Sequence, residues 1–160
     1  MTKQIMVGGV AVGGGAPVTI QSMCNTKTED AGATIEQILR LEQAGCEIVR
    51  VTVPTPEAAE ACGNLVRAGI PVSCQTVLLA GVNDSAEAML ALFRALQRAR
   101  VRPYYVFQCD PVAGIAHFRV PLERARQIER ACAARIGGLG LPRFVADLPD
   151  ADRKTPISEL

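Results

Sequence analysis

Stretches with strand character alternate with stretches of helical spacing along most of this chain, and this alternation limits the fold more than any other feature. Runs of apolar residues mark the strands, and apolar residues repeated every three to four positions mark the helices. Strands are expected at residues 18–20, 46–53, 71–79, 102–109 and 143–147. Helices are expected from about residues 30, 56, 85 and 121. This order of elements predicts an α/β fold with about five parallel strands and four helices.

The extent of the sheet follows from the length of the chain. A complete (β/α) barrel needs about 250 residues, whereas this chain has 160. We therefore expect either an open sheet or a partial (β/α) barrel. Two short alternating stretches around Gly8 and Gly9 predict a β-hairpin at the N-terminus. An open sheet has two unpaired edges, which favours an oligomer or a complementing chain that covers them.

Charge and hydropathy narrow the classes of partner. The chain has 17 Lys and Arg residues against 16 Asp and Glu residues, so no strong field attracts nucleic acid or an anionic membrane. There is no run of about 18 apolar residues, and the N-terminal sequence MTKQIMVGG does not resemble a signal peptide. These features predict a cytoplasmic protein that binds a small-molecule substrate, without a nucleic-acid or membrane partner.

The cysteines are widely spaced, and no two are closer than twelve positions in the sequence. They are Cys24, Cys46, Cys62, Cys74, Cys109 and Cys132. Local metal sites usually contain pairs such as CxxC, and a disulfide framework is unusual in a cytoplasmic protein. We therefore expect free, mostly buried thiols and no metal site.

One arginine lies within an apolar strand. Because strand side chains alternate, Ile48, Arg50 and Thr52 share one face of the expected strand at residues 46–53. A buried, unpaired guanidinium would cost several kcal/mol. Arg50 is therefore expected to meet either a carboxylate of the protein or an anionic ligand, and the pattern does not choose between them.

Two carboxylates and a lysine are expected near the carboxyl ends of the last two strands, where parallel β/α folds bind their ligands. Alternation places Asp110 on the face of Val106 and Asp147 on the face of Val145, and Lys154 follows shortly after the last strand. The alternative interpretation is that the carboxylates cap helices or form loop salt bridges, and that Lys154 is a solvated charge. Spacing alone does not decide between these interpretations.

The first third of the chain contains the segments VGGVAVGGGAPVTIQSMCNTKTED and ATIEQILRLEQAGCEIVRVTVP. Together they resemble the N-terminus of the 4-hydroxy-3-methylbut-2-enyl diphosphate synthase family of isoprenoid biosynthesis, over about residues 3–54. The resemblance implies the start of a barrel that holds a cyclic diphosphate, with Arg50 facing the phosphates. This family depends on flavodoxin or ferredoxin and uses an iron-sulfur cluster, whose cysteines belong to a C-terminal domain absent from this sequence.

The remainder contains the segments AGIPVSCQTVLLAGVND, RVRPYYVFQCD, HFRVPLERARQIE and PRFVADLPDADRKTP. These are similar to lysine 2,3-aminomutase of the radical S-adenosylmethionine family, over about residues 56–157. The similarity implies that Lys154 forms the Schiff base with pyridoxal phosphate. It also implies that Asp110 and Asp147 bind the distal amine of the substrate lysine, because two carboxylates can select a second ammonium group.

The sequence departs from the aminomutase pattern at three places. Acids and an arginine at residues 150–153 replace the glycine run before the cofactor lysine, and Phe107 replaces a tyrosine. The cluster motif CxxxCxxC is absent. We therefore expect pyridoxal phosphate to be held weakly, and the iron-sulfur cluster and S-adenosylmethionine, which the families imply, to have no ligands here.

The two resemblances divide the chain into residues 1–54, the start of a synthase-like barrel, and residues 55–157, an aminomutase-like segment. We expect the two to form one continuous folded unit. The predicted function is that of a fragment or fusion related to lysine 2,3-aminomutase, inactive alone, whose parent reaction moves an amino group on an amino acid. One alternative is the reductive ring-opening of a cyclic diphosphate in terpenoid biosynthesis, and another is a non-catalytic scaffold.

Overall fold

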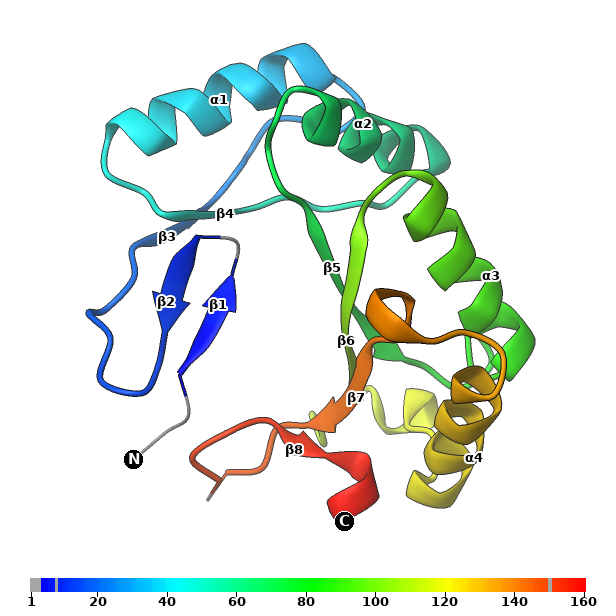
Figure 1. Cartoon of the computed structure of the whole chain (residues 1–160). Helices are drawn as coiled ribbons and strands as arrows, with labels where there is room; N and C mark the ends of the chain where they lie inside the picture. The colour runs from blue at the N-terminus through cyan, green and yellow to red at the C-terminus, as the bar shows by residue number, and fades with distance from the viewer. Residues whose placement is uncertain (1–3, 8, 150) are drawn as a thin grey trace. The chain divides into compact units, whose positions relative to one another are not determined.

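The computed structural model describes residues 4–7, 9–149 and 151–160. The chain divides into two compact units, residues 1–72 and residues 73–160, here called unit 1 and unit 2. Strands and helices alternate in each of them (Figure 1). This confirms the predicted α/β class.

Unit 1 begins with a β-hairpin. Its strands β1 (Ile5–Val7) and β2 (Val10–Val12) pair antiparallel, as the sequence predicts. Gly14, on the way to the next strand, has a φ angle of +60°. A Cβ atom at this position would lie only 2.5 Å from Cβ of Gln4. Glycine is required here because any side chain would collide with Gln4 and would strain the backbone.

A two-stranded parallel sheet follows in unit 1. Strand β3 (Gln21–Met23) pairs with β4 (Ile48–Arg50), and α1 (Ala31–Gln43) connects them. The expected strand at residues 18–20 is therefore wrong by three positions. The apolar residues there gave a strand pattern, but pairing with β4 begins only at Gln21, and the side chain of Val18 is 96% exposed.

The helices of unit 1 begin where local capping signals predict. Asp30 caps α1, because its Oδ1 accepts a hydrogen bond of 3.0 Å from the backbone nitrogen of Ala33. Thr55 caps α2 (Pro56–Arg67) in the same way, with Oγ1 at 3.2 Å from the nitrogen of Ala58. A glycine with a φ angle of +89° follows each helix and ends it.

Unit 2 contains one four-stranded sheet. Its strands, in spatial order, are β5 (Ser73–Leu78), β6 (Arg102–Gln108), β7 (Arg143–Ala146) and β8 (Thr155–Pro156). The first three are parallel, and β8 is antiparallel to β7. The sheet is therefore mixed, whereas the sequence predicts parallel strands only.

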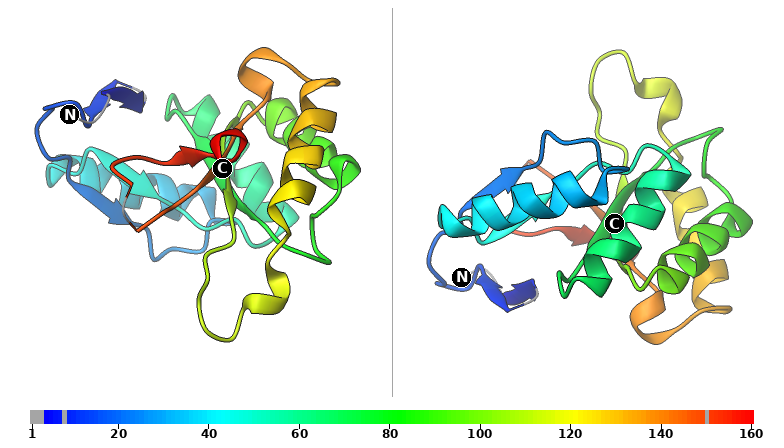
Figure 2. Two further views of the ribbon diagram at one scale, coloured as in Figure 1. Left: turned by 90° about the horizontal axis from the view of Figure 1, so that it is seen from below. Right: turned by 90° about the horizontal axis from the view of Figure 1, so that it is seen from above.

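Two helices cover one face of the unit 2 sheet. They are α3 (Ala86–Arg98) and α4 (Leu122–Ala133), which lie side by side (Figures 1 and 2). The core between helices and sheet is largely aliphatic, and it contains two phenylalanines, Phe93 of α3 and Phe144 of β7. Their rings meet edge to face, with centroids 6.4 Å apart. The side chains of Phe93 and Phe144 therefore lie on the face of the sheet that packs against the helices. The candidate site lies on the opposite face.

The described residues form three separate sheets, namely the hairpin, the β3–β4 pair and the sheet of unit 2. No closed barrel is present among them. No helix in the described part of the chain has both the length and the apolar character needed to cross a membrane.

Candidate functional site

The pairing of β7 with β8 brings two of the predicted site residues together in unit 2. Asp147 directly follows β7 and Lys154 directly precedes β8, and Ala146 pairs with Thr155 between them. The Nζ atom of Lys154 lies 2.6 Å from Oδ2 of Asp147. Both side chains remain more than 40% exposed. The site therefore has a charged amine that is reachable from solvent and is held in a defined position.

An aromatic ring lies beside this amine. The Nζ atom of Lys154 is 5.1 Å from the centroid of the Phe107 ring, within the range of a cation–π contact. Phe107 pairs with Val145 across the sheet, whereas Val106 pairs with the core residue Phe144. Lys154 therefore lies on the face of the sheet opposite to the core. In the sequence, Phe107 stood out only as a departure from a family pattern. Its place beside the lysine depends on the pairing of Phe107 with Val145, which joins two different strands.

Asp110 forms no hydrogen bond or ion pair with either member of this pair among the described contacts. It follows β6 by two residues, it is exposed, and its carboxylate forms no ion pair with any described residue. Its backbone oxygen accepts a hydrogen bond of 2.8 Å from the nitrogen of Val112, which turns the chain after the strand. The structure thus joins Asp147 to Lys154 and shows no contact of Asp110 with either of them.

Gln108 is a polar residue whose role sequence analysis did not identify. It lies at the end of β6, and its Nε2 atom donates a hydrogen bond to the backbone oxygen of Val120. Its Oε1 atom is buried and has no hydrogen-bond partner among the described residues. Gln108 therefore ties the end of β6 to the segment that leads into α4, and so supports the strand that carries Phe107.

Arg50 is at the carboxyl end of β4 in unit 1. Its side chain is exposed, so the cost of a buried, unpaired charge does not arise there. No described residue forms an ion pair with its guanidinium. Its backbone oxygen accepts a hydrogen bond of 2.9 Å from the nitrogen of Cys24, which fixes the segment after β3 beside it.

The cysteines are poor candidates for metal ligands. Four of the six, Cys46, Cys62, Cys109 and Cys132, are buried. Burial raises the pKa values of Cys24 and Cys62, and raises the pKa of Cys132 to about 11. Metals bind the thiolate form, which is disfavoured when the pKa rises. Among the described residues, no three Cys, His, Asp or Glu side chains are placed to hold a metal ion.

We accordingly expect the chain to assemble no stoichiometric iron-sulfur cluster. Anaerobic reconstitution with iron and sulfide, followed by assay of both elements, measures this directly. Incorporation of about four irons per chain, as a [4Fe–4S] cluster requires, together with visible charge-transfer absorption, would contradict the expectation.

Comparison with known proteins defines the family. The family model of the GcpE TIM-barrel domain matches residues 2–137, which is most of the chain. The chain belongs to this family. A 4-hydroxy-3-methylbut-2-en-1-yl diphosphate synthase (flavodoxin) of Cellvibrio japonicus is 64% identical over 62 residues, which are 39% of this GcpE-family chain and 17% of that protein.

A second group of relatives carries another name. A putative L-lysine 2,3-aminomutase of Aquifex aeolicus is 48% identical over 103 residues, covering 64% of this chain and 28% of that protein. The L-lysine 2,3-aminomutase of Bacillus subtilis is 45% identical over the same share of the chain and 22% of its own length. Both resemblances expected from the sequence are therefore confirmed. The chain spans only about a quarter of the length of these curated aminomutase relatives.

Proposed function

We propose that this chain is an aminomutase-related fragment that captures pyridoxal phosphate weakly through Lys154 and does not move amino groups by itself. The observation that supports the proposal is the position of the Lys154 amine, held by Asp147 at 2.6 Å and beside the ring of Phe107. An amine in this setting is accessible to an aldehyde, and the neighbouring aromatic face suits a planar pyridine ring.

The residues present suit the aldehyde end of pyridoxal phosphate and do not suit its phosphate. Arg153, the cation next to Lys154, is engaged with Glu159 at 2.7 Å. Asp152 adds a negative charge beside it, and Asp150 lies outside the described residues. When bound, pyridoxal phosphate supplies an electron sink for chemistry on amino groups. Without a phosphate cradle this chain holds it weakly.

Asp147 has two roles in this proposal, and they follow one another. In the structure its carboxylate is occupied by the ammonium group of Lys154. To hold the cofactor, Lys154 would have to leave this ion pair and release a proton to solvent, which would leave the Asp147 carboxylate available. We propose that it binds the ammonium group of an amino-acid substrate at this stage, together with Asp110.

The iron-sulfur cluster of the parent families does not fit the described residues, because no three candidate metal ligands are placed together. The proposal therefore includes no step that requires this cluster. A complementing chain that covers the open sheet edges would have to supply it.

Reduction with borohydride followed by peptide mapping tests the lysine site. The sequence has three lysines, Lys3, Lys27 and Lys154. The label is expected at Lys154, because it is the lysine beside an aromatic ring and a carboxylate. A label distributed evenly over all three lysines would show nonspecific surface chemistry, and the aminomutase relation would then describe ancestry alone.

A second candidate function belongs to unit 1. There, binding of a cyclic diphosphate is favoured by Arg50 at the carboxyl end of β4, which is exposed and has no ion pair with any described residue. Parallel β/α units place their ligands at this edge. We propose that residues 1–54 and residues 55–157 contribute these two sites from two origins. The compact units of the structure divide later, between residues 72 and 73.

Replacement of Arg50 by alanine is expected to weaken binding of the cyclic diphosphate about tenfold, because a charge-assisted contact to a phosphate is lost. Isothermal calorimetry of the two proteins gives the difference. Arg40→Ala is the matched control, since Arg40 is an exposed arginine of unit 1 that pairs with Glu36 on α1. Equal affinity of wild type and Arg50→Ala would remove the role of Arg50.

A further inference from the structure

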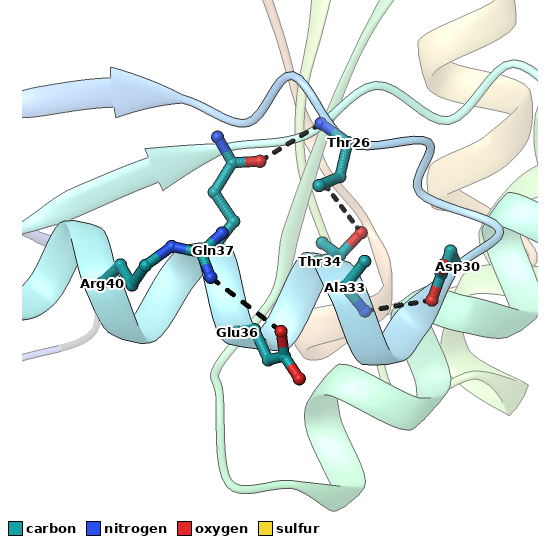
Figure 3. Close-up of polar contacts among 7 residues, drawn as sticks. All are labelled: Thr26, Asp30, Ala33, Thr34, Glu36, Gln37 and Arg40. Carbon is teal, nitrogen blue, oxygen red and sulfur yellow. Dashed lines mark hydrogen bonds and ion pairs between the residues drawn. The ribbon is translucent and has the colours of Figure 1, made fainter.

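The segment between β3 and α1 is held to the helix by side chains that no part of the proposed function has used. Gln37 of α1 accepts two hydrogen bonds with its Oε1 atom, from the backbone nitrogens of Asn25 at 3.2 Å and Thr26 at 3.1 Å. Figure 3 shows the bond to Thr26. Gln37 thus fixes the backbone immediately after the carboxyl end of β3.

A buried hydroxyl adds a second attachment. Thr34 is completely buried, and its Oγ1 lies 3.0 Å from Oγ1 of Thr26 (Figure 3). The Thr34 hydroxyl also donates a hydrogen bond of 3.3 Å to the backbone oxygen of Lys27. The same oxygen accepts a bond of 3.0 Å from the nitrogen of Asp30. Each of these contacts limits where the backbone of Lys27 can lie.

The segment is also attached to the strand that carries Arg50. The nitrogen of Cys24 donates to the backbone oxygen of Arg50 at 2.9 Å. Lys27 is three residues further along, and three residues of chain span at most about 11 Å. The backbone of Lys27 therefore stays near β4, at a separation that is compatible with contact of both long side chains, Lys27 and Arg50, with one diphosphate.

The charges around these two cations leave room for such an anion. Lys27 and Arg50 are both exposed, and neither forms an ion pair with a described residue. The nearby carboxylate of Glu29 accepts a hydrogen bond of 3.0 Å from the hydroxyl of Thr55, the N-cap of α2. Two exposed cations that have no ion-pair partner among the described residues, near the carboxyl edge of one parallel sheet, suit a phosphate or diphosphate group.

We propose that Gln37 is a positioning residue that holds the segment after β3 so that Lys27 joins Arg50 on a bound diphosphate. This inference rests on the anion site proposed for unit 1, and adds a second cation and the group that places it. Gln37 does not contact the ligand. It acts through the backbone of Asn25 and Thr26.

Calorimetric titration of the full chain with inorganic diphosphate tests the inference. Lys27→Met is expected to weaken binding about tenfold, as loss of a charge-assisted contact does. Gln37→Met keeps the size of the side chain and removes the hydrogen-bond acceptor. It is expected to weaken diphosphate binding about threefold to tenfold, because Lys27 is then less well placed to contact the diphosphate. Gln43→Met is the matched control, an exposed glutamine at the end of the same helix, and is expected to bind as wild type does.

The double variant separates positioning from general damage. If Gln37 acts only by positioning Lys27, the double variant Gln37→Met with Lys27→Met binds diphosphate no more weakly than Lys27→Met alone. Once Lys27 is replaced, its position no longer matters. Losses that simply add would overturn the positioning role. Circular dichroism checks that Gln37→Met is folded. If that variant does not fold, Lys27→Met still tests the second cation, because Lys27 is exposed and its replacement does not disturb the core.

The affinities of the variants distinguish a wrong role for Gln37 and Lys27 from the absence of any anion site at Arg50. If Arg50→Ala loses affinity for diphosphate while Lys27→Met and Gln37→Met keep that of wild type, the anion site stands and the inference is overturned. If wild type binds no diphosphate, or Arg50→Ala binds it equally well, the site and the inference are both overturned.

Discussion

Replacement of Phe93 by alanine is expected to lower the free energy of unfolding of unit 2 by about 3–5 kcal/mol, the usual loss for a large aromatic removed from a core. Phe93 is 1% exposed and meets Phe144 edge to face. Its removal leaves a cavity between α3 and the sheet and also deletes the aromatic contact. Because Phe144 belongs to β7, the strand that leads to Asp147 loses support.

Urea unfolding followed by tyrosine fluorescence measures this loss. The sequence has no tryptophan, and its two tyrosines, Tyr104 and Tyr105, both lie on β6. Their fluorescence therefore reports on unit 2. Leu139→Ala is the matched control, because Leu139 is a large apolar residue of the same unit that is 74% exposed, and its loss is expected to change stability by less than about 0.5 kcal/mol. Equal effects of both variants would contradict the packing of the core.

Replacement of Lys154 by alanine is expected to abolish specific labelling by pyridoxal phosphate and borohydride. The amine is the group that reacts, so no partial activity survives its removal. Total incorporation is measured by absorbance of the reduced adduct after removal of free cofactor. Lys27→Met is the matched control, because Lys27 is an exposed lysine of unit 1, and it is expected to leave the label unchanged.

A third variant tests the ion pair at this site. Asp147→Asn removes the carboxylate that holds the amine and is expected to speed labelling by about twofold to fivefold, since an exposed ion pair contributes up to about 1 kcal/mol. Slower labelling would show that the carboxylate assists capture. Undiminished label in Lys154→Ala would contradict the lysine site itself.

Local signals in the sequence predicted the helices well. Thr55 and Pro56 mark the start of α2, and a glycine ends each helix of unit 1, because caps depend on neighbouring residues alone. The first strand was misplaced because its position depends on the partner strand. Residues 18–20 have a suitable pattern, yet β4 pairs with residues 21–23.

The candidate site depended on a contact that no local pattern contains. Strand β8 is two residues long and includes Pro156, so periodicity gave no sign of it. Its pairing with β7 nevertheless brings Lys154 to Asp147. Alternation correctly indicated which residues of β6 share a face, but which face packs on the helices follows only from the fold. The family resemblance, rather than spacing, singled out the lysine in advance.

We propose that this chain carries two independent partial sites, a diphosphate site at Arg50 and a lysine site at Lys154. Labelling with pyridoxal phosphate and borohydride in the presence of saturating cyclic diphosphate distinguishes two sites from one. Label at Lys154 is expected to be unchanged within about twofold, because Arg50 and Lys154 belong to different units. Label at Lys154 that falls in proportion to diphosphate occupancy would show instead that both ligands share one site.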